Sequence, residues 1–144
     1  MKGAALLVAL VALASVGAVI TTGFALAQSE SRAGLAAVAR VQAQSAAETA
    51  AADALRGWDV ADTPQAAGQE NRIVQLNLPG SVVGVATVRS LGGPVYAIRA
   101  TGVRREASGS AIGFAEIEVL VLLDSVPQGR IQPRIYPRGW RILP

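Results

Sequence analysis

The sequence predicts an α+β protein in which one long N-terminal helix packs against a small antiparallel β-sheet. Three observations lead to this fold class. Residues 4–58 contain few helix breakers and many strong helix formers. Residues 59–71 then change in composition to Asp, Thr, Pro, Gln and Gly. Three later segments alternate apolar and polar residues with a period of two, which is typical of strands that bury one face.

The first half of the predicted helix, residues 4–27, is an apolar run without a charged residue, and Lys2 is the only charge before it. A helix of ~20 apolar residues is long enough to cross the ~30 Å hydrocarbon core of a bilayer. We therefore expect a transmembrane segment here.

The second half of the predicted helix, residues 28–58, is polar and rich in alanine, and it should lie outside the membrane. Its large apolar residues are few, namely Leu35, Val38, Val41 and Leu55. A narrow face of this kind allows another helix to approach closely, or the protein's own sheet. The sequence leaves both options open. Gly57, preceded by Arg56, is the predicted end of the helix.

Residues 59–71 are the predicted linker, since Thr63-Pro64 and Gly68 favour a loop. Residues 72–144, called the head below, contain the predicted strands. The apolar positions that alternate with polar ones are Val74, Leu76 and Leu78, then Tyr96, Ile98 and Ala100, then Ile117, Val119 and Val121. Turns are predicted at Pro79-Gly80 and at Gly92-Gly93-Pro94, and residues 104–113 form a longer polar connection. The alternation predicts that the apolar side of this sheet lies over the polar half of the helix.

The head ends in a predicted basic tail. No acidic residue follows Asp124, whereas four arginines do: Arg130, Arg134, Arg138 and Arg141. Such a tail can bind phosphates, acidic lipid headgroups or an acidic patch on a partner, or it can simply be solvated. A nucleic-acid partner has no other support, because only two aromatic residues, Tyr136 and Trp140, accompany these arginines.

The composition argues against an enzyme and against a bound cofactor. With no Cys and no His among 144 residues, the chain lacks a disulfide framework, a Zn-type cluster and His-based acid–base chemistry. Glu116 and Glu118 share one side of a predicted strand, but it is the polar, outward side. Ser108 and Ser110 have no histidine to act as a base.

Three interpretations of the N-terminus remain. A secretory signal peptide would be cut after Ala27, where small residues precede the polar segment. The apolar run is longer than such signals need, and no break follows it. An uncut membrane anchor is the second interpretation. The third is a short basic leader that ends at Gly3 and is removed on the cytoplasmic side.

The third interpretation is carried by a resemblance to a known family. The motifs are Met1-Lys2-Gly3 followed by Ala4-Ala5-Leu6-Leu7-Val8-Ala9-Leu10, the polar helix with Ala46-Ala47-Glu48, and the strand pair Tyr96–Gly102 and Ile117–Val121. Together they resemble minor pilins of the PilX type and GspK-type pseudopilins of the type IV pilin-like superfamily.

This resemblance implies that prepilin peptidase cuts between Gly3 and Ala4 and that Ala4 is methylated. It implies an inner-membrane protein with a periplasmic head that later joins an extracytoplasmic filament of a type IV pilus or a type II secretion system. Its partners would be other pilin-like subunits, bound through the N-terminal helix. The helix positions concerned are Leu6, Leu7, Val8, Leu10 and Leu13.

One position departs from the pattern of major pilins. Those proteins carry a glutamate as the fifth residue of the mature chain, and that position is Val8 here. The resemblance therefore implies a subunit at the tip of the filament or in its initiation. The alternative, from another functional class, is a small secreted or periplasmic binding domain released by cleavage after Ala27.

Overall fold

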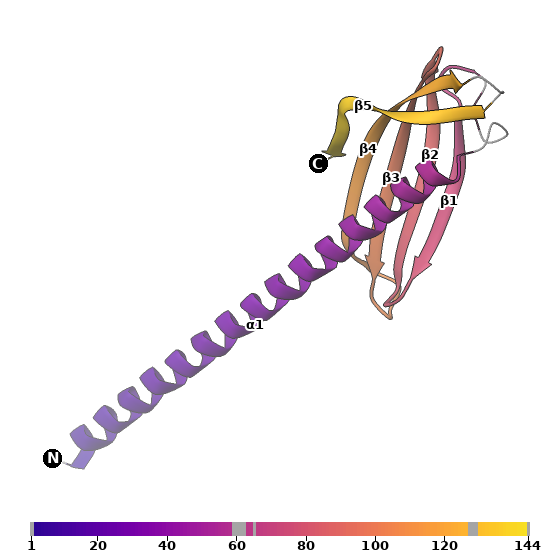
Figure 1. Ribbon diagram of the computed structural model, residues 1–144. Helices are drawn as coiled ribbons and strands as arrows, with labels where there is room; N and C mark the ends of the chain where they lie inside the picture. The colour runs from indigo at the N-terminus through magenta and orange to yellow at the C-terminus, as the bar shows by residue number, and fades with distance from the viewer. Residues whose placement is uncertain (1, 59–62, 65, 127–129, 144) are drawn as a thin grey trace. The chain divides into compact units, whose positions relative to one another are not determined.

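The α+β fold class is confirmed. In the computed structural model, the described residues are 2–58, 63, 64, 66–126 and 130–143, and the side chains of 2–9, 72, 125, 126, 130–132 and 138 lie outside the description. The elements are α1 (Lys2–Arg56), β1 (Glu70–Leu78), β2 (Val82–Gly92), β3 (Val95–Arg105), β4 (Ala111–Val126) and β5 (Arg130–Leu143), as Figure 1 shows. The chain divides into two compact units, Met1–Ala36 and Ala37–Pro144, each described by itself below.

Helix α1 runs without interruption from Lys2 to Arg56, as the scarcity of helix breakers predicts. It ends where Gly57 was expected to end it. The Gly57 backbone N–H donates to the Asp53 carbonyl at 2.8 Å, and the exposed Arg56 guanidinium pairs with the Asp53 carboxylate at 2.8 Å in the last turn. A cation at this end also interacts favourably with the helix dipole.

The sheet is an antiparallel meander with the strand order β1-β2-β3-β4-β5. The predicted turns at Pro79-Gly80 and at Gly92–Pro94 connect β1 to β2 and β2 to β3. Gly80 and Gly92 have φ values of 79° and 103°. Glycine adopts positive φ values with little conformational strain because it has no Cβ, whereas other residues are strained there. The three predicted alternating segments lie in β1, β3 and β4.

Three sequence predictions need correction. The predicted basic tail is strand β5, paired along β4 from Val126↔Arg130 to Glu116↔Leu143. The predicted linker is shorter than 59–71, because β1 begins at Glu70; residues 59–62 and 65 of that linker lie outside the description. The connection predicted at 104–113 shortens to a turn, because β3 continues to Arg105 and β4 begins at Ala111.

Within the C-terminal unit, α1 covers one face of the sheet, called the inner face, and the other is called the outer face. The helix contributes almost only alanines to this contact. They are Ala39, Ala43, Ala46, Ala47, Ala50, Ala51 and Ala54, each at most 2% exposed. Opposite them lie Val88, Ile98, Ile117, Val119 and Val121, which are fully buried. The alanine-rich face of this stretch therefore packs on the protein's own sheet, one of the two options that the sequence left open.

A row of glycines brings the helix backbone unusually close to the sheet. Gly84, Gly102 and Gly113 lie on β2, β3 and β4. A Cβ at Gly102 would lie 1.8 Å from the Ala43 carbonyl oxygen, and one at Gly113 would lie 2.4 Å from that of Ala39. At Gly84 the distance to the Ala46 oxygen would be 2.6 Å. Only a hydrogen fits in these positions, so the three glycines set the separation between helix and sheet.

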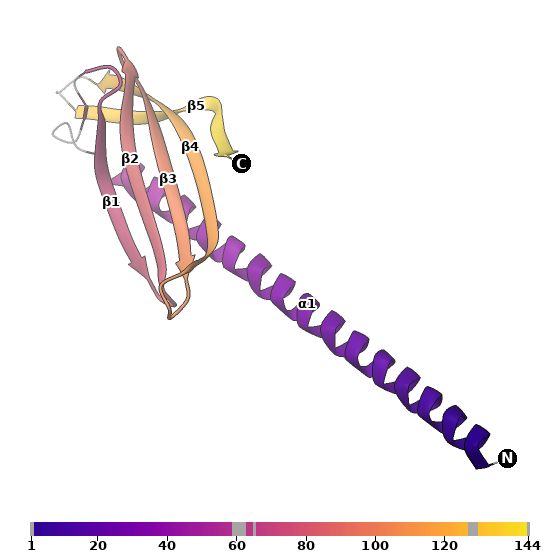
Figure 2. The ribbon, with the colours of Figure 1, turned by 180° about the vertical axis from the view of Figure 1, so that it is seen from behind.

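Strand β5 is bent. Val119 pairs with Trp140 and Val121 pairs with Ile135, so residues 136–139 lie opposite the single Leu120. Figures 1 and 2 show β5 turning from the plane of the other strands toward the side of α1. The view from behind shows β1 to β4 in front of α1, so no described helix covers the outer face (Figure 2).

Candidate interaction surfaces

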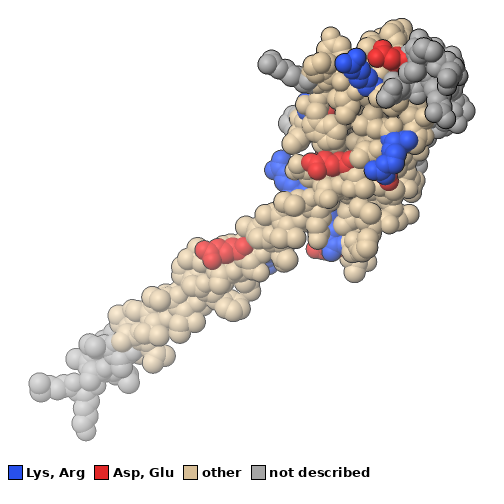
Figure 3. Space-filling view, viewed as in Figure 1, with Lys and Arg blue, Asp and Glu red and all other residues tan. Residues whose placement is uncertain are grey.

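The N-terminal part of α1 presents an apolar surface. From Leu10 to Leu26 its large side chains are exposed, with Leu13 at 76%. In Figure 3 the described surface of α1 stays free of red and blue atoms until the middle of the helix. By length and composition this helix can cross a membrane, although a signal sequence would pass the same test. Leu10 and Leu13 lie on this surface.

The other helix positions predicted for processing and assembly lie nearer the N-terminus. Gly3, Ala4, Leu6, Leu7 and Val8 all belong to α1. Their side chains lie outside the described residues, so only their helical backbone is known.

The hydroxyl groups in the apolar part of α1 all bond within the helix. Ser15 Oγ donates to the Val11 carbonyl at 2.8 Å, and Thr22 Oγ1 to the Ala18 carbonyl at 2.8 Å. Thr21 Oγ1 donates to the Gly17 carbonyl at 3.0 Å. Hydroxyls that find an acceptor on their own helix need no water, so they fit a hydrocarbon environment.

The outer face of the sheet carries cross-strand ion pairs. Arg99 Nε lies 2.9 Å from Glu116 Oε1, and Arg141 Nε donates to Glu118 Oε1 at 3.0 Å. The side chains of Glu116 and Glu118 are 21% and 13% exposed. They are more enclosed than the solvated positions that the sequence predicts, because β3 and β5 supply an arginine on each side. Exposed guanidiniums limit what such pairs add to stability, typically to less than ~1 kcal/mol.

The four arginines of the predicted tail are spread along β5 instead of forming a free segment. Arg141 binds Glu118, and Arg134 lies 3.9 Å from the Asp124 carboxylate in an exposed, loose pair. The side chains of Arg130 and Arg138 lie outside the described residues. The two described arginines thus face acidic partners within the sheet.

A hollow of about 400 Å³ opens on the outer face beside these ion pairs. Its apolar lining consists of Leu91, Ala97, Leu120 and Gly139, and its charged lining of Glu70, Arg89, Arg99, Glu118 and Arg141. Arg141 is the only one of these that the sequence singled out as a binding residue.

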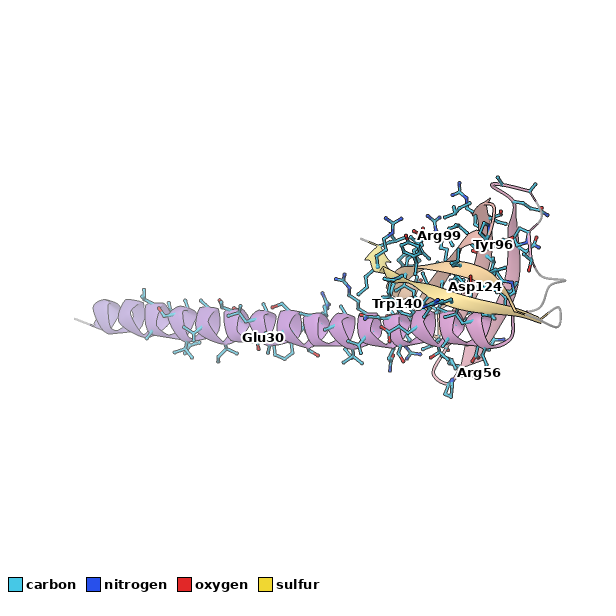
Figure 4. The ribbon with its side chains drawn as sticks, turned by 45° about the horizontal axis from the view of Figure 1, so that its top comes forward. Glu30, Arg56, Tyr96, Arg99, Asp124 and Trp140 are labelled. Atoms are coloured by element: carbon cyan, nitrogen blue, oxygen red, sulfur yellow. The ribbon has the colours of Figure 1, made fainter. Side chains whose placement is uncertain are left out.

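Three exposed apolar residues lie on the inner-face side of β5, opposite the side that carries the hollow. Trp140, Ile142 and Ile135 pair with inner-face residues of β4, yet each is at least 41% exposed. Figure 4 shows Trp140 on the side of β5 toward α1, whereas Arg99 projects from the opposite side of the sheet. Charges of both signs are interspersed over the visible face of the C-terminal unit (Figure 3).

Within the part of the chain that the structure describes, no group of three or more His, Cys, Asp or Glu residues could hold a metal ion. Comparison with protein-family models, curated proteins and solved structures finds no match. The resemblance to minor pilins therefore rests on the motifs quoted above and stays a prediction.

Proposed function

We propose that this protein is a structural subunit of a pilin-like filament, a minor pilin or pseudopilin that is cut after Gly3 and inserted in the inner membrane. The N-terminal helix then joins similar subunits in the filament of a type IV pilus or type II secretion system. The head faces the periplasm before assembly. The proposal assigns no enzymatic activity and no cofactor.

The observation that carries this proposal is the continuity of α1. One helix includes both the exposed, uncharged segment and the alanine face that packs directly on the sheet. An apolar segment that continues as the same helix into a folded domain suits lateral packing with copies of the same element. A signal peptide is instead discarded, and nothing requires its helix to continue into the mature domain.

A second candidate function has its own support. The C-terminal unit begins at Ala37, so cleavage after Ala27 would remove no residue of that unit. The released product would be a small periplasmic or secreted binding domain. The obstacle is that Ala27 lies inside helix α1, which would have to open for the cut.

Mass spectrometry of the mature N-terminus separates the two candidates. The filament proposal expects a chain that begins at Ala4, with or without an N-methyl group. A chain that begins at Gln28 would establish the secreted domain and end the filament proposal.

The position within the filament is proposed from Val8. A carboxylate near the start of the apolar segment costs up to about 3 kcal/mol in hydrocarbon unless an amine meets it. A tip subunit has no earlier subunit above it to supply that amine. Val8→Glu is therefore expected to reduce assembly or leave it unchanged, never to improve it, and immunogold labelling of the unaltered protein should mark filament ends. Labelling evenly along the filament would contradict the tip position.

A further inference from the structure

The outer-face hollow has a small-residue floor between long charged side chains. Arg89, Ala97 and Leu120 are register neighbours on β2, β3 and β4. Ala97 is 4% exposed although it belongs to the uncovered face, because longer side chains surround it. Gly139 approaches Leu120 so closely that a Cβ would lie 3.0 Å from Leu120 Cβ. The accessible apolar lining of the hollow is therefore Leu91 and Leu120, because the side chains around Ala97 already cover it.

The arginines around this floor retain unused donors. Arg99 turns its Nε to Glu116, and Arg141 is held by Glu118, so both guanidiniums are oriented by carboxylates from β4. Among the described residues, Arg89 has no carboxylate within ion-pair distance. A guanidinium has five N–H donors in a flat fork that matches a carboxylate.

We propose that the outer-face hollow binds a monocarboxylate that carries a short apolar group. The apolar group contacts Leu91 and Leu120, and the carboxylate accepts hydrogen bonds from Arg89 and from the free edge of Arg99.

Glu118 binds Arg141, and Glu116 beside the hollow binds Arg99, so Arg89 is the lining arginine whose fork is open to one carboxylate. Among the described residues, Glu70 is its register neighbour on β1 but makes no ion pair with it. Glu70 and Glu118 would repel a dianionic phosphate more strongly than a monoanion, which favours a monocarboxylate.

This ligand chemistry has two sources, the C-terminus of a peptide and a free organic acid. The probes are N-acetyl-Ala-Leu with a free carboxylate, the same dipeptide as its amide, hexanoate, and inorganic phosphate. Each is titrated into the ¹⁵N-labelled full chain in zwitterionic detergent, and the amide shifts of Ala97, Leu120 and Gly139 are followed. Binding of the dipeptide acid alone identifies the peptide source, and equal binding of hexanoate identifies the organic acid. Either result supports the site.

Arg89→Gln is the test variant, because Arg89 is exposed and holds no described ion pair. We expect the dissociation constant of the better carboxylate to rise about fivefold or more, since an exposed charge-assisted pair is lost. Arg89→Lys keeps the positive charge but not the forked guanidinium. Its dissociation constant should therefore lie between those of Arg89→Gln and the unaltered chain. Arg134→Gln is the matched control: it removes an exposed arginine outside the hollow and should change the constant less than about twofold.

Three results would overturn the proposal: no shift with either carboxylate, equal shifts with the dipeptide amide, or tighter binding of phosphate. An unchanged constant in Arg89→Gln would also overturn it. The site lies in the head and is independent of filament assembly. If the binding proposal fails, the proposed function is unaffected, and if the filament proposal fails, the binding proposal is unaffected.

Discussion

Gly102→Ala is expected to lower the free energy of unfolding of the C-terminal unit by about 3 kcal/mol or more. This is at least the largest loss that is usual when a methyl group is added to a well-packed core. The added methyl group would meet the Ala43 carbonyl oxygen at 1.8 Å and the Ala47 nitrogen at 2.9 Å. Both are backbone atoms of α1, which cannot move aside like a flexible side chain. The helix must lift from the sheet, and its buried alanines must give up contacts. Urea unfolding of the detergent-solubilised chain measures the loss.

The fluorescence of Trp58 can follow that unfolding, because its ring packs edge-on against Tyr96 with centroids 5.5 Å apart. Gly113→Ala and Gly84→Ala should be milder, since their methyl groups would lie 2.4 and 2.6 Å from a helix oxygen. Thr101→Val is the matched control. It changes the adjacent residue on the outer face and should alter the free energy of unfolding by less than about 0.5 kcal/mol. Equal stability of Gly102→Ala and the unaltered chain would refute the close backbone contact.

The sequence predicts β1, β3 and β4 because their polarity alternates. It does not predict β2, and this omission has a physical reason. In β2 the inner positions Val82, Ala86 and Val88 are apolar, but so are the outer positions Val83 and Val85. An apolar run on both faces has no period of two, so the pattern that marks the other strands is absent there.

Strand β5 was predicted as a tail from charge alone, because four arginines and no acidic residue follow Asp124. The strand also contains Pro133, Pro137 and Gly139, which are unfavourable inside most strands. An edge strand pairs on one side only, and it can carry prolines whose missing N–H faces away from the ladder. The bend at residues 136–139 absorbs Pro137 and Gly139. Its position at the sheet edge, which the sequence does not reveal, makes these residues acceptable.

The glycine row and the outer-face ion pairs depend on register, and register is not visible in the sequence. Gly84 and Gly102 lie far apart along the chain and become partners only when β2 pairs with β3. Arg141 reaches Glu118 only because β5 is a strand. By contrast, the apolar part of α1 is fully apparent in the sequence, since it needs no partner to be recognised. The long apolar helix segment was therefore predictable, whereas the hollow was not.

The maturation of the chain should depend entirely on the residue before the proposed cut. In Gly3→Leu we expect the precursor to stay uncut and to remain in the inner membrane. The peptidase implied by the resemblance accepts a small residue at this position, and an isobutyl side chain would occupy space that glycine leaves to the enzyme. The intact mass of the membrane-bound protein measures the effect: the precursor keeps Met1 to residue 3, and the mature chain lacks them.

Ala27→Leu is the paired variant, because it removes the small residue that a signal peptidase would need. The two substitutions have opposite consequences under the two candidate functions. The filament proposal expects Ala27→Leu to mature normally and Gly3→Leu to be arrested, whereas the secreted-domain alternative expects the reverse. Both changes leave the residues of the C-terminal unit untouched, so misfolding of the head cannot imitate either outcome. Normal maturation of Gly3→Leu, with the same N-terminus as the unaltered protein, would reject the prepilin interpretation.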